Sequence, residues 1–331
     1  MRTGAAGFLS KGVEREMQPL KPADSGKMRR FFRRLSEYRV LLLMLAPAVA
    51  FFIVFCYIPM FGMLIAFKNY DYSLGILRSP WVGFSNFTFL FRSGKLVSLF
   101  ANTVLYNLAF ILVGLVFQLF ISVILSELSG RVFKKFCQTA VFLPYFVSIV
   151  VVGAIVYNLL NYRYGFINAI LTAFGAEKIN FYANAGWWPF ILIVANTWKN
   201  MGYGSVVYLA AITGIDAEIY EAAQIDGATI LQRIFRITLP NLLPTIITVT
   251  LLNIGSIFRG NFQLFWNLVG SNSLLYKTTD VIDTYVYRSM LKGTDYGMTG
   301  AAGMLQSMLC FGMIMAVNAI VKKINAESAL F

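Results

Sequence analysis

The side chains best suited to bind a solute lie inside long apolar runs of the sequence. In two of these runs they are Asn196, Trp198, Lys199, Asn200, Tyr203, Asn253 and Ser256. Polar groups in such runs are costly to bury, so they face a cavity or hydrogen-bond a neighbouring helix. Asn253, Ser256 and Ile257 are spaced i, i+3 and i+4, which places them on one helix face. Their amide and hydroxyl groups offer donors and acceptors to a polar solute.

Lys199 is the most unusual of these residues. It lies near the middle of its apolar run, too deep for its ammonium to reach the membrane surface easily. Its charge could meet an anionic solute or a carboxylate of a partner protein. Gln263, Trp266 and Asn267 follow the later run, and we expect them to line the outer part of a cavity or a re-entrant turn. For any one of these residues, the alternative is a structural hydrogen bond between helices.

Catalytic chemistry finds little support in the sequence. The chain has no His, which removes the commonest general base and metal ligand, and its three Cys lie in apolar runs. A phosphate loop needs the pattern G-x-x-x-x-G-K-[ST]. The two Gly-Lys pairs, Gly26-Lys27 and Gly94-Lys95, lack both its first glycine and its hydroxyl residue. We therefore expect no catalytic residue, no metal and no cofactor in this chain.

Composition indicates a membrane protein. Hydrophobic residues make up 58% of the 331 residues, charged residues make up 13%, and the mean hydropathy is +0.67. Soluble domains carry about a quarter charged residues. The net charge is +13, but ten of the 28 Lys and Arg lie in residues 1–39 and most others lie between apolar runs. Such a distribution is typical of a bilayer protein and argues against nucleic-acid binding.

Six apolar intervals predict an all-α fold with six transmembrane helices, since about 20 residues cross the hydrocarbon core. They are Val40–Phe67, Thr103–Leu125, Cys137–Leu160, Trp187–Ile212, Leu242–Ile257 and Met298–Val321. The fourth is the most polar, and the fifth is short enough to need flanking residues. The first is too long for a signal peptide, whose apolar region has about 7–15 residues.

Charge predicts the orientation of these spans. Arginines crowd the N-terminal tail, residues 126–136 carry three cations, and Lys322-Lys323 closes the last span. The positive-inside rule then places both termini in the cytoplasm. The tail, residues 1–39, includes a segment, Lys27–Arg39, that alternates arginines with Phe and Leu. This segment is either an interfacial helix or a disordered basic tail. Residues 40–323 form the membrane domain, and residues 324–331 form a short C-terminal tail.

The polar interval 214–240 predicts two short helices joined by a turn. Asp216 can cap the first helix, Ala222 and Ala223 favour it, and Gly227 permits a sharp bend. A second short helix is expected over Thr229–Arg236, and Pro240 suits the first turn of the next span. Such a protruding pair of helices could insert into a groove of a partner protein. The alternative is an ordinary amphipathic loop.

The same interval reads Glu221-Ala222-Ala223, three residues, Gly227, nine residues, then Ile237-x-Leu239-Pro240. This pattern resembles the coupling motif of permeases of binding-protein-dependent ABC importers. The resemblance implies a type I ABC importer permease fold whose cytoplasmic loop docks onto a separate ATPase, which binds ATP and Mg²⁺. Glu221 and Asp226 would then anchor the bend by charge, while the small residues allow close approach.

Further segments resemble the carbohydrate branch of this family, and the resemblance spans about Leu41 to Lys323. They are Phe142–Phe146, Ser79–Phe87 and Val281–Arg288, the last being similar to permeases for complex oligosaccharides. The resemblance implies import of an oligosaccharide, of plant or algal polysaccharide origin, across a bacterial cytoplasmic membrane. Its implied partners are a sister permease, forming a heterodimer, two ATPase subunits and an external solute-binding protein.

The resemblance also implies where the sugar passes. The spans that flank the coupling segment would line its path, which makes these residues candidates: Lys199, Asn200, Tyr203, Asn253, Ser256, Ile257 and Gln263. Lys199 would face an acidic sugar or a carboxylate of the sister permease. The alternatives to a sugar permease are an ABC permease for a peptide or another solute, and an ion-coupled secondary transporter. The latter predicts buried acidic relays, and none of the six predicted spans contains Asp or Glu.

Overall fold

The computed structural model describes residues 38–92, 94–293 and 296–324. These residues form two compact units, one ending at Phe61 and the other beginning at Gly62, and each is considered by itself. The predicted segment Lys27–Arg39, apart from its end, and residues 325–331 of the predicted C-terminal tail lie outside the described residues.

The first unit is one helical rod made of α2 (Arg39–Phe52), a π-turn η1 (Ile53–Tyr57) and α3 (Ile58–Met60). Pro59 has no backbone N–H, so it cannot donate to the carbonyl four residues earlier, in the π-turn. A wider turn at this point is the usual response of a helix to a missing donor. The apolar segment Arg39–Phe67 is long enough to cross a membrane, in agreement with the first predicted span.

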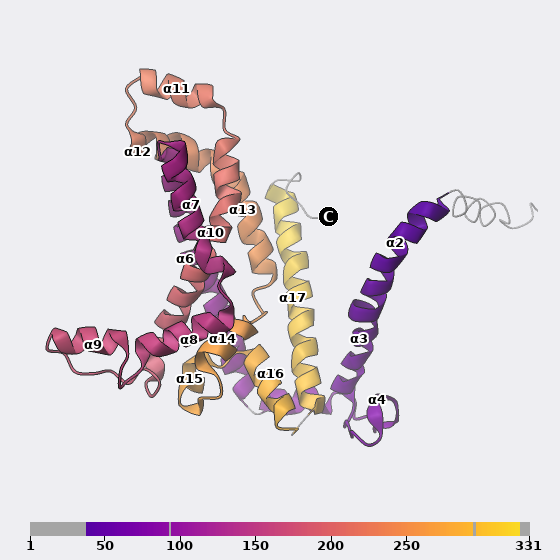
Figure 1. Ribbon diagram of the computed structural model, residues 1–331. Coiled ribbons are helices and arrows are strands. Elements are labelled where there is room, and N and C mark those ends of the chain that lie inside the picture. The colour runs from indigo at the N-terminus through magenta and orange to yellow at the C-terminus, as the bar shows by residue number, and fades with distance from the viewer. Residues whose placement is uncertain (1–37, 93, 294–295, 325–331) are drawn as a thin grey trace, which may run out of the picture. The chain divides into compact units, whose positions relative to one another are not determined.

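The second unit is also helical, and no strand is present among the described residues (Figure 1). Its helices are α4 (Gly75–Arg78), α5 (Ser85–Arg92), α6 (Lys95–Glu127), α7 (Arg131–Phe146), α8 (Ile149–Leu160), α9 (Phe166–Ala173), α10 (Trp188–Thr213), α11 (Ala217–Ile225), α12 (Ile230–Arg233), α13 (Leu239–Gly255), α14 (Phe262–Val269), α15 (Tyr276–Thr279), α16 (Ile282–Leu291) and α17 (Tyr296–Ile324). Short 3-10 turns and π-turns η2 (Phe61–Phe67), η3 (Ala185–Trp187), η4 (Ile234–Thr238) and η5 (Ser273–Leu275) join some of them. The all-α prediction is confirmed for this part of the chain.

Four helical segments in the described ranges are long and apolar enough to span a membrane. They are Arg39–Phe67, Lys95–Glu127, Ile230–Gly255 and Tyr296–Lys323. The pair α7 and α8 makes a fifth if the two count as one span. The predicted fourth span corresponds to α10, which has the length but is not among the segments that are apolar enough to qualify.

Two predicted spans differ from the structure. The third, Cys137–Leu160, is broken into α7 and α8, whose axes differ by 93°. Val147 and Ser148 are extended there, with ψ of 129° and 140°, directly after the end of α7, which contains Pro144. The fifth does not begin at Leu242: its helical segment starts at Ile230 and ends at Gly255. It therefore includes the predicted second short helix.

The main core joins α6, α8, α10 and α14. Trp188 and Leu192 of α10 are fully buried against Phe265 of α14 and Val152 of α8. The indole of Trp188 donates to the carbonyl of Phe181 at 2.8 Å, so its one polar atom is satisfied. This packing fixes the N-terminal half of α10, from which several candidate residues project.

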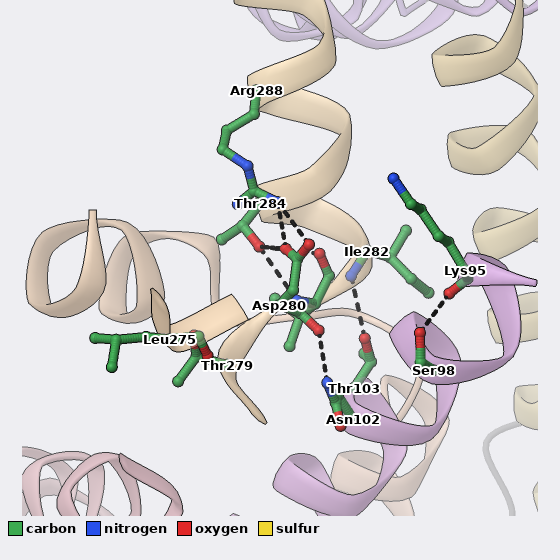
Figure 2. Close-up of polar contacts among 11 residues, drawn as sticks. Lys95, Ser98, Asn102, Thr103, Leu275, Thr279, Asp280, Ile282, Thr284 and Arg288 are labelled. Carbon is green, nitrogen blue, oxygen red and sulfur yellow. Dashed lines mark hydrogen bonds and ion pairs between the residues drawn. The ribbon is translucent and has the colours of Figure 1, made fainter. Parts of the chain in front are cut away.

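A polar network attaches α16 to α6 (Figure 2). Arg288 forms an ion pair with Asp280 at 2.6 Å. The Asn102 amide donates to the Asp280 carbonyl at 3.0 Å, and the Ile282 N–H donates to Thr103 at 3.2 Å. The run Val281–Arg288, noted in the sequence, thus belongs to a connection between helices that are distant in the chain.

Candidate functional site

The first helix of the coupling segment, residues 214–240, is shaped by local hydrogen bonds. Asp216 caps α11 by accepting a hydrogen bond from the Glu218 N–H at 3.0 Å, as the sequence predicted. At the other end, Ala228 N–H donates to the Ala223 carbonyl at 2.9 Å. Gly227 N–H donates to the carbonyl three residues earlier at 3.1 Å. This pair of bonds is a Schellman motif, which explains the glycine of the motif.

Gly227 has a φ of +76°, the left-handed region that glycine enters without steric cost. A Cβ added at this position would meet no atom within 4 Å. The constraint on Gly227 is therefore conformational, while the space beside it is free for a partner protein.

The second helix of the coupling segment continues directly into the membrane. Thr229 caps α12 in a reciprocal capping box with Gln232. The prediction of a separate short helix over Thr229–Arg236 is wrong, because the π-turn η4 joins α12 to α13 without a break. Leu239 N–H bonds five residues back, to Ile234, and Pro240 supplies no donor. The missing donor accounts for the wider turn at this point.

The coupling segment presents an acidic and apolar surface. Glu221, Ala222, Asp226 and Gly227 are exposed, as is Pro240, and Ala223, Ile237 and Leu239 are half-buried. Exposed apolar side chains surround them, with Ile225 at 87% and Phe235 at 66% exposure, together with Ile230 and Leu231. Figure 1 shows α11 and α12 at one end of the second unit, away from α14, α15 and α16. Exposed apolar groups gathered in this way mark an interaction surface.

A polar cavity of about 220 Å³ lies among α6, α10, α13 and the loop that follows α13. It is lined by Asn107, Phe110, Ile111, Leu115, Gln118, Asn196, Asn200, Tyr208, Thr250, Asn253, Ser256 and Asn261. None of these lining residues is charged. The cavity brings together three of the predicted pathway residues: Asn200 of α10, Asn253 of α13, and Ser256 directly after the end of α13.

Gln118 is the cavity residue that the sequence prediction most clearly missed. It projects from α6 across Gly204 of α10, where an added Cβ would lie 2.3 Å from its amide. Among the described residues that amide has no hydrogen-bonding partner, which leaves it free for a ligand. Gln118 and Asn107 are polar residues within the second predicted span. The rule that selected Asn200 and Asn253 would have found them, had it been applied beyond the spans that flank the coupling segment.

Lys199 and Tyr203 project from α10 toward the break between α7 and α8. The Lys199 ammonium donates to the carbonyls of Tyr145 at 3.0 Å and Val147 at 2.6 Å. Tyr203 stacks on the Tyr145 ring with centroids 4.2 Å apart. The last carbonyls of a helix have no partners within it and carry partial negative charge. Lys199 therefore caps α7 where the broken span turns.

Ile257 and Gln263 lie outside the residues that line the cavity. The expected shared helix face of Asn253, Ser256 and Ile257 does not form, because α13 ends at Gly255. Ile257 follows in a turn and is buried, while its carbonyl accepts a hydrogen bond from Asn107 at 2.9 Å. Gln263, which was expected to line either the outer part of a cavity or a re-entrant turn, is exposed on the short helix α14.

Comparison with known proteins identifies the family. Residues 114–325 match the family described as binding-protein-dependent transport system inner membrane component. The polygalacturonan/rhamnogalacturonan transport system permease protein YteP of Bacillus subtilis is 34% identical over 91% of this chain and 93% of its own length.

A bacterial ABC transporter involved in the import of the acidic polysaccharide alginate has a chain of the same fold. That chain matches with a TM-score of 0.81 and 33% identity, over 89% of this chain and 99% of its own length. A second structure, of the alginate transporter in complex with an alginate pentasaccharide-bound periplasmic protein, matches with a TM-score of 0.80 and 33% identity over 89% and 98%. The chain belongs to the family of inner membrane components of binding-protein-dependent transport systems.

Proposed function

We propose that this chain is the permease subunit of an ATP-driven oligosaccharide importer and couples a separate ATPase to alternating access. One observation carries the proposal: a single helical segment, Ile230–Gly255, begins in the exposed coupling segment and ends at a polar cavity. Movement of its first end is therefore transmitted mechanically to Thr250 and Asn253 near its other end. A helix rises about 1.5 Å per residue, so roughly 30–35 Å of helix separates Ile230 from these two residues.

The proposed topology has six spans with both termini and the coupling segment in the cytoplasm. It counts α10 as a span despite its polar residues and counts α7 with α8 as one bent span. The cationic intervals 126–136 and 322–323 support this orientation through the positive-inside rule. Figure 1 supports the grouping, since the loop between α6 and α7 lies at the same end of the unit as α11 and α12.

The proposed partner of the coupling segment is the nucleotide-binding subunit. Its groove would receive the apolar side chains Ile225 and Phe235, and its cations would meet Glu221 and Asp226. ATP and Mg²⁺ are then bound by two copies of that ATPase and not by this chain. A sister permease would complete the translocation path, and an external solute-binding protein would deliver the sugar.

The cavity suggests how the sugar is bound. Six amide side chains and three hydroxyl groups line it, which suits the donors and acceptors of sugar hydroxyls. Because its lining residues are uncharged, we expect this chain to bind hydroxyl groups rather than carboxylates. The printed substrates of the relatives, polygalacturonan or rhamnogalacturonan and alginate, support an oligosaccharide as the class of substrate.

The test is reconstitution of this chain in proteoliposomes with its candidate sister permease, ATPase and solute-binding protein. We expect ATP hydrolysis to rise when the binding protein carries one member of an oligosaccharide panel that includes neutral and uronic sugars. Glu221→Lys should abolish this rise, and Lys135→Met, an exposed charge change on α7, should not.

Two results would contradict the proposal in different ways. Failure of the chain to retain any ATPase subunit would overturn the coupling role. Assembly of the complex without stimulation by any sugar would overturn the carbohydrate assignment and leave the importer fold intact.

A further inference from the structure

We propose that the hydrogen bond between Tyr220 and Thr238 is the contact through which the coupling helix α11 moves α13. The inference rests on the proposed coupling function and adds two positioning residues to it. The two hydroxyl oxygens lie 2.9 Å apart and are 18 residues apart in the sequence. Neither residue belongs to the exposed surface that the ATPase would contact.

The bond connects the two parts of the segment that must move together. Tyr220 lies in α11, beside Glu221, and Thr238 is the last residue of the π-turn η4. Among the described residues, it is the one side-chain hydrogen bond from α11 to another helix. Otherwise α11 is joined to its neighbours by the loops at its two ends, as Figure 1 shows. A load applied to α11 would bend these loops unless a side chain carried it across.

Thr238 is placed where such a load has the most effect. It is 1% exposed, so its hydroxyl has no access to water. A π-turn interrupts the regular hydrogen bonds of a helix, and bends concentrate at such turns. By binding Thr238, Tyr220 holds the bend angle between α12 and α13 and ties it to the position of α11. The cavity residues Thr250 and Asn253 follow on the same helix.

Removing the Tyr220 hydroxyl and removing the Thr238 hydroxyl should affect coupling to different extents. Removing the Tyr220 hydroxyl leaves the buried Thr238 oxygen with a single weak contact, to the Arg233 carbonyl at 3.5 Å. Removing the Thr238 hydroxyl leaves Tyr220, which is half-buried and can turn to water. An unsatisfied buried group costs more than a hydrogen bond that is simply lost. Tyr220→Phe should therefore act at least as strongly as Thr238→Val.

The experiment measures sugar transported per ATP hydrolysed in proteoliposomes that contain the full complex. Tyr220→Phe and Thr238→Val should each lower this ratio about five-fold, the factor that a hydrogen bond of typical net strength supplies. The double variant should be no worse than Tyr220→Phe, because both changes remove the same bond. Co-purification of the ATPase subunit should be unchanged in all three. Thr238→Ser keeps the hydroxyl and should retain most of the ratio.

Thr248→Val is the matched control, since its hydroxyl bonds the Pro244 carbonyl within α13 and lies outside the cavity. A wild-type ratio in Tyr220→Phe, or equal losses in Thr238→Ser and Thr238→Val, would overturn the proposal. If Thr238→Val fails to assemble, Tyr220→Phe decides alone. Glu221→Lys distinguishes failure of this inference from failure of the proposed coupling function. If Glu221→Lys uncouples the complex and Tyr220→Phe does not, only the proposed role of Tyr220 and Thr238 is contradicted. If Glu221→Lys leaves transport intact, both the proposed coupling function and the proposed role of Tyr220 and Thr238 are contradicted.

Discussion

The coupling segment and the polar cavity are built on opposite principles. In the coupling segment nearly every hydrogen bond joins residues a few positions apart, such as the Asp216 cap and the turn at Gly227. The cavity instead gathers side chains from α6, α10, α13 and the loop after α13. The proposed docking surface, used by a partner of fixed shape, can be made by local contacts. The proposed sugar site has to open and close, so it must lie where several helices meet.

The largest effect is expected at the turn of the coupling segment. Gly227→Val places a β-branched residue at a φ of +76°, which such residues almost never adopt. The turn must change, and we expect a more than ten-fold loss of sugar-stimulated ATP hydrolysis, consistent with about 1–3 kcal/mol of backbone strain.

Gly227→Asn is the control for this prediction, because Asn tolerates the left-handed region and the space around the residue is empty. It should retain most of the activity. Full activity in the Val variant would show that the local turn is dispensable and that the docking surface is not made locally.

The next largest effect is expected at Lys199, where a variant can show whether this residue stabilises the fold or binds the sugar. Lys199→Met removes two charge-assisted hydrogen bonds to the end of α7. We expect the free energy of unfolding to fall by about 3 kcal/mol, since each such bond contributes roughly 1.5–3 kcal/mol. The transition temperature of the purified complex should fall, while the sugar concentration for half-maximal ATP hydrolysis stays the same.

Lys135→Met, the exposed change on α7, should leave the transition temperature unchanged. A shift in the half-maximal sugar concentration without a change in stability would instead place Lys199 in the sugar path.

A smaller effect is expected for the amides of the cavity. Gln118→Leu and Asn253→Leu keep similar volumes but remove donors and acceptors, so each should raise the half-maximal sugar concentration about ten-fold. Basal ATP hydrolysis and the transition temperature should not change. Asn158→Leu, whose amide bonds within α8 away from the cavity, is the matched control. Equal shifts in all three variants would show that the cavity is not the sugar site.

The smallest effect concerns the shape of the cavity wall. Gly204→Ala would bring a Cβ within 2.3 Å of the Gln118 amide, and that flexible side chain must move. A rotamer displaced in this way costs about 0.5–1.5 kcal/mol, so we expect the half-maximal sugar concentration to rise about three-fold. Gly303→Ala, on α17 with no atom within 4 Å, should have no effect. A Gly204→Ala variant indistinguishable from wild type would mean that Gln118 does not bind the sugar.

Pattern reasoning succeeded where the controlling interactions are short in sequence. The cap at Asp216 and the bend at Gly227 were predicted correctly because each depends on a few neighbouring residues. It failed at the third span, where Pro144 is tolerated in α7 and the bend comes three residues later at Val147. It also failed at Ile257, because periodicity alone does not reveal that α13 ends at Gly255.

By itself, the sequence determined the membrane class of the chain, its helical fold and the capped helix and turn at residues 216–227. These follow from hydropathy, from helix periodicity and from capping residues, which act over a few residues. Only the tertiary structure decided that Lys199 caps a helix 52 to 54 residues away in the chain, and that Gln118 faces the cavity. The reason is physical: a polar side chain within a span must find a partner, and the packing of the helices determines which one it meets.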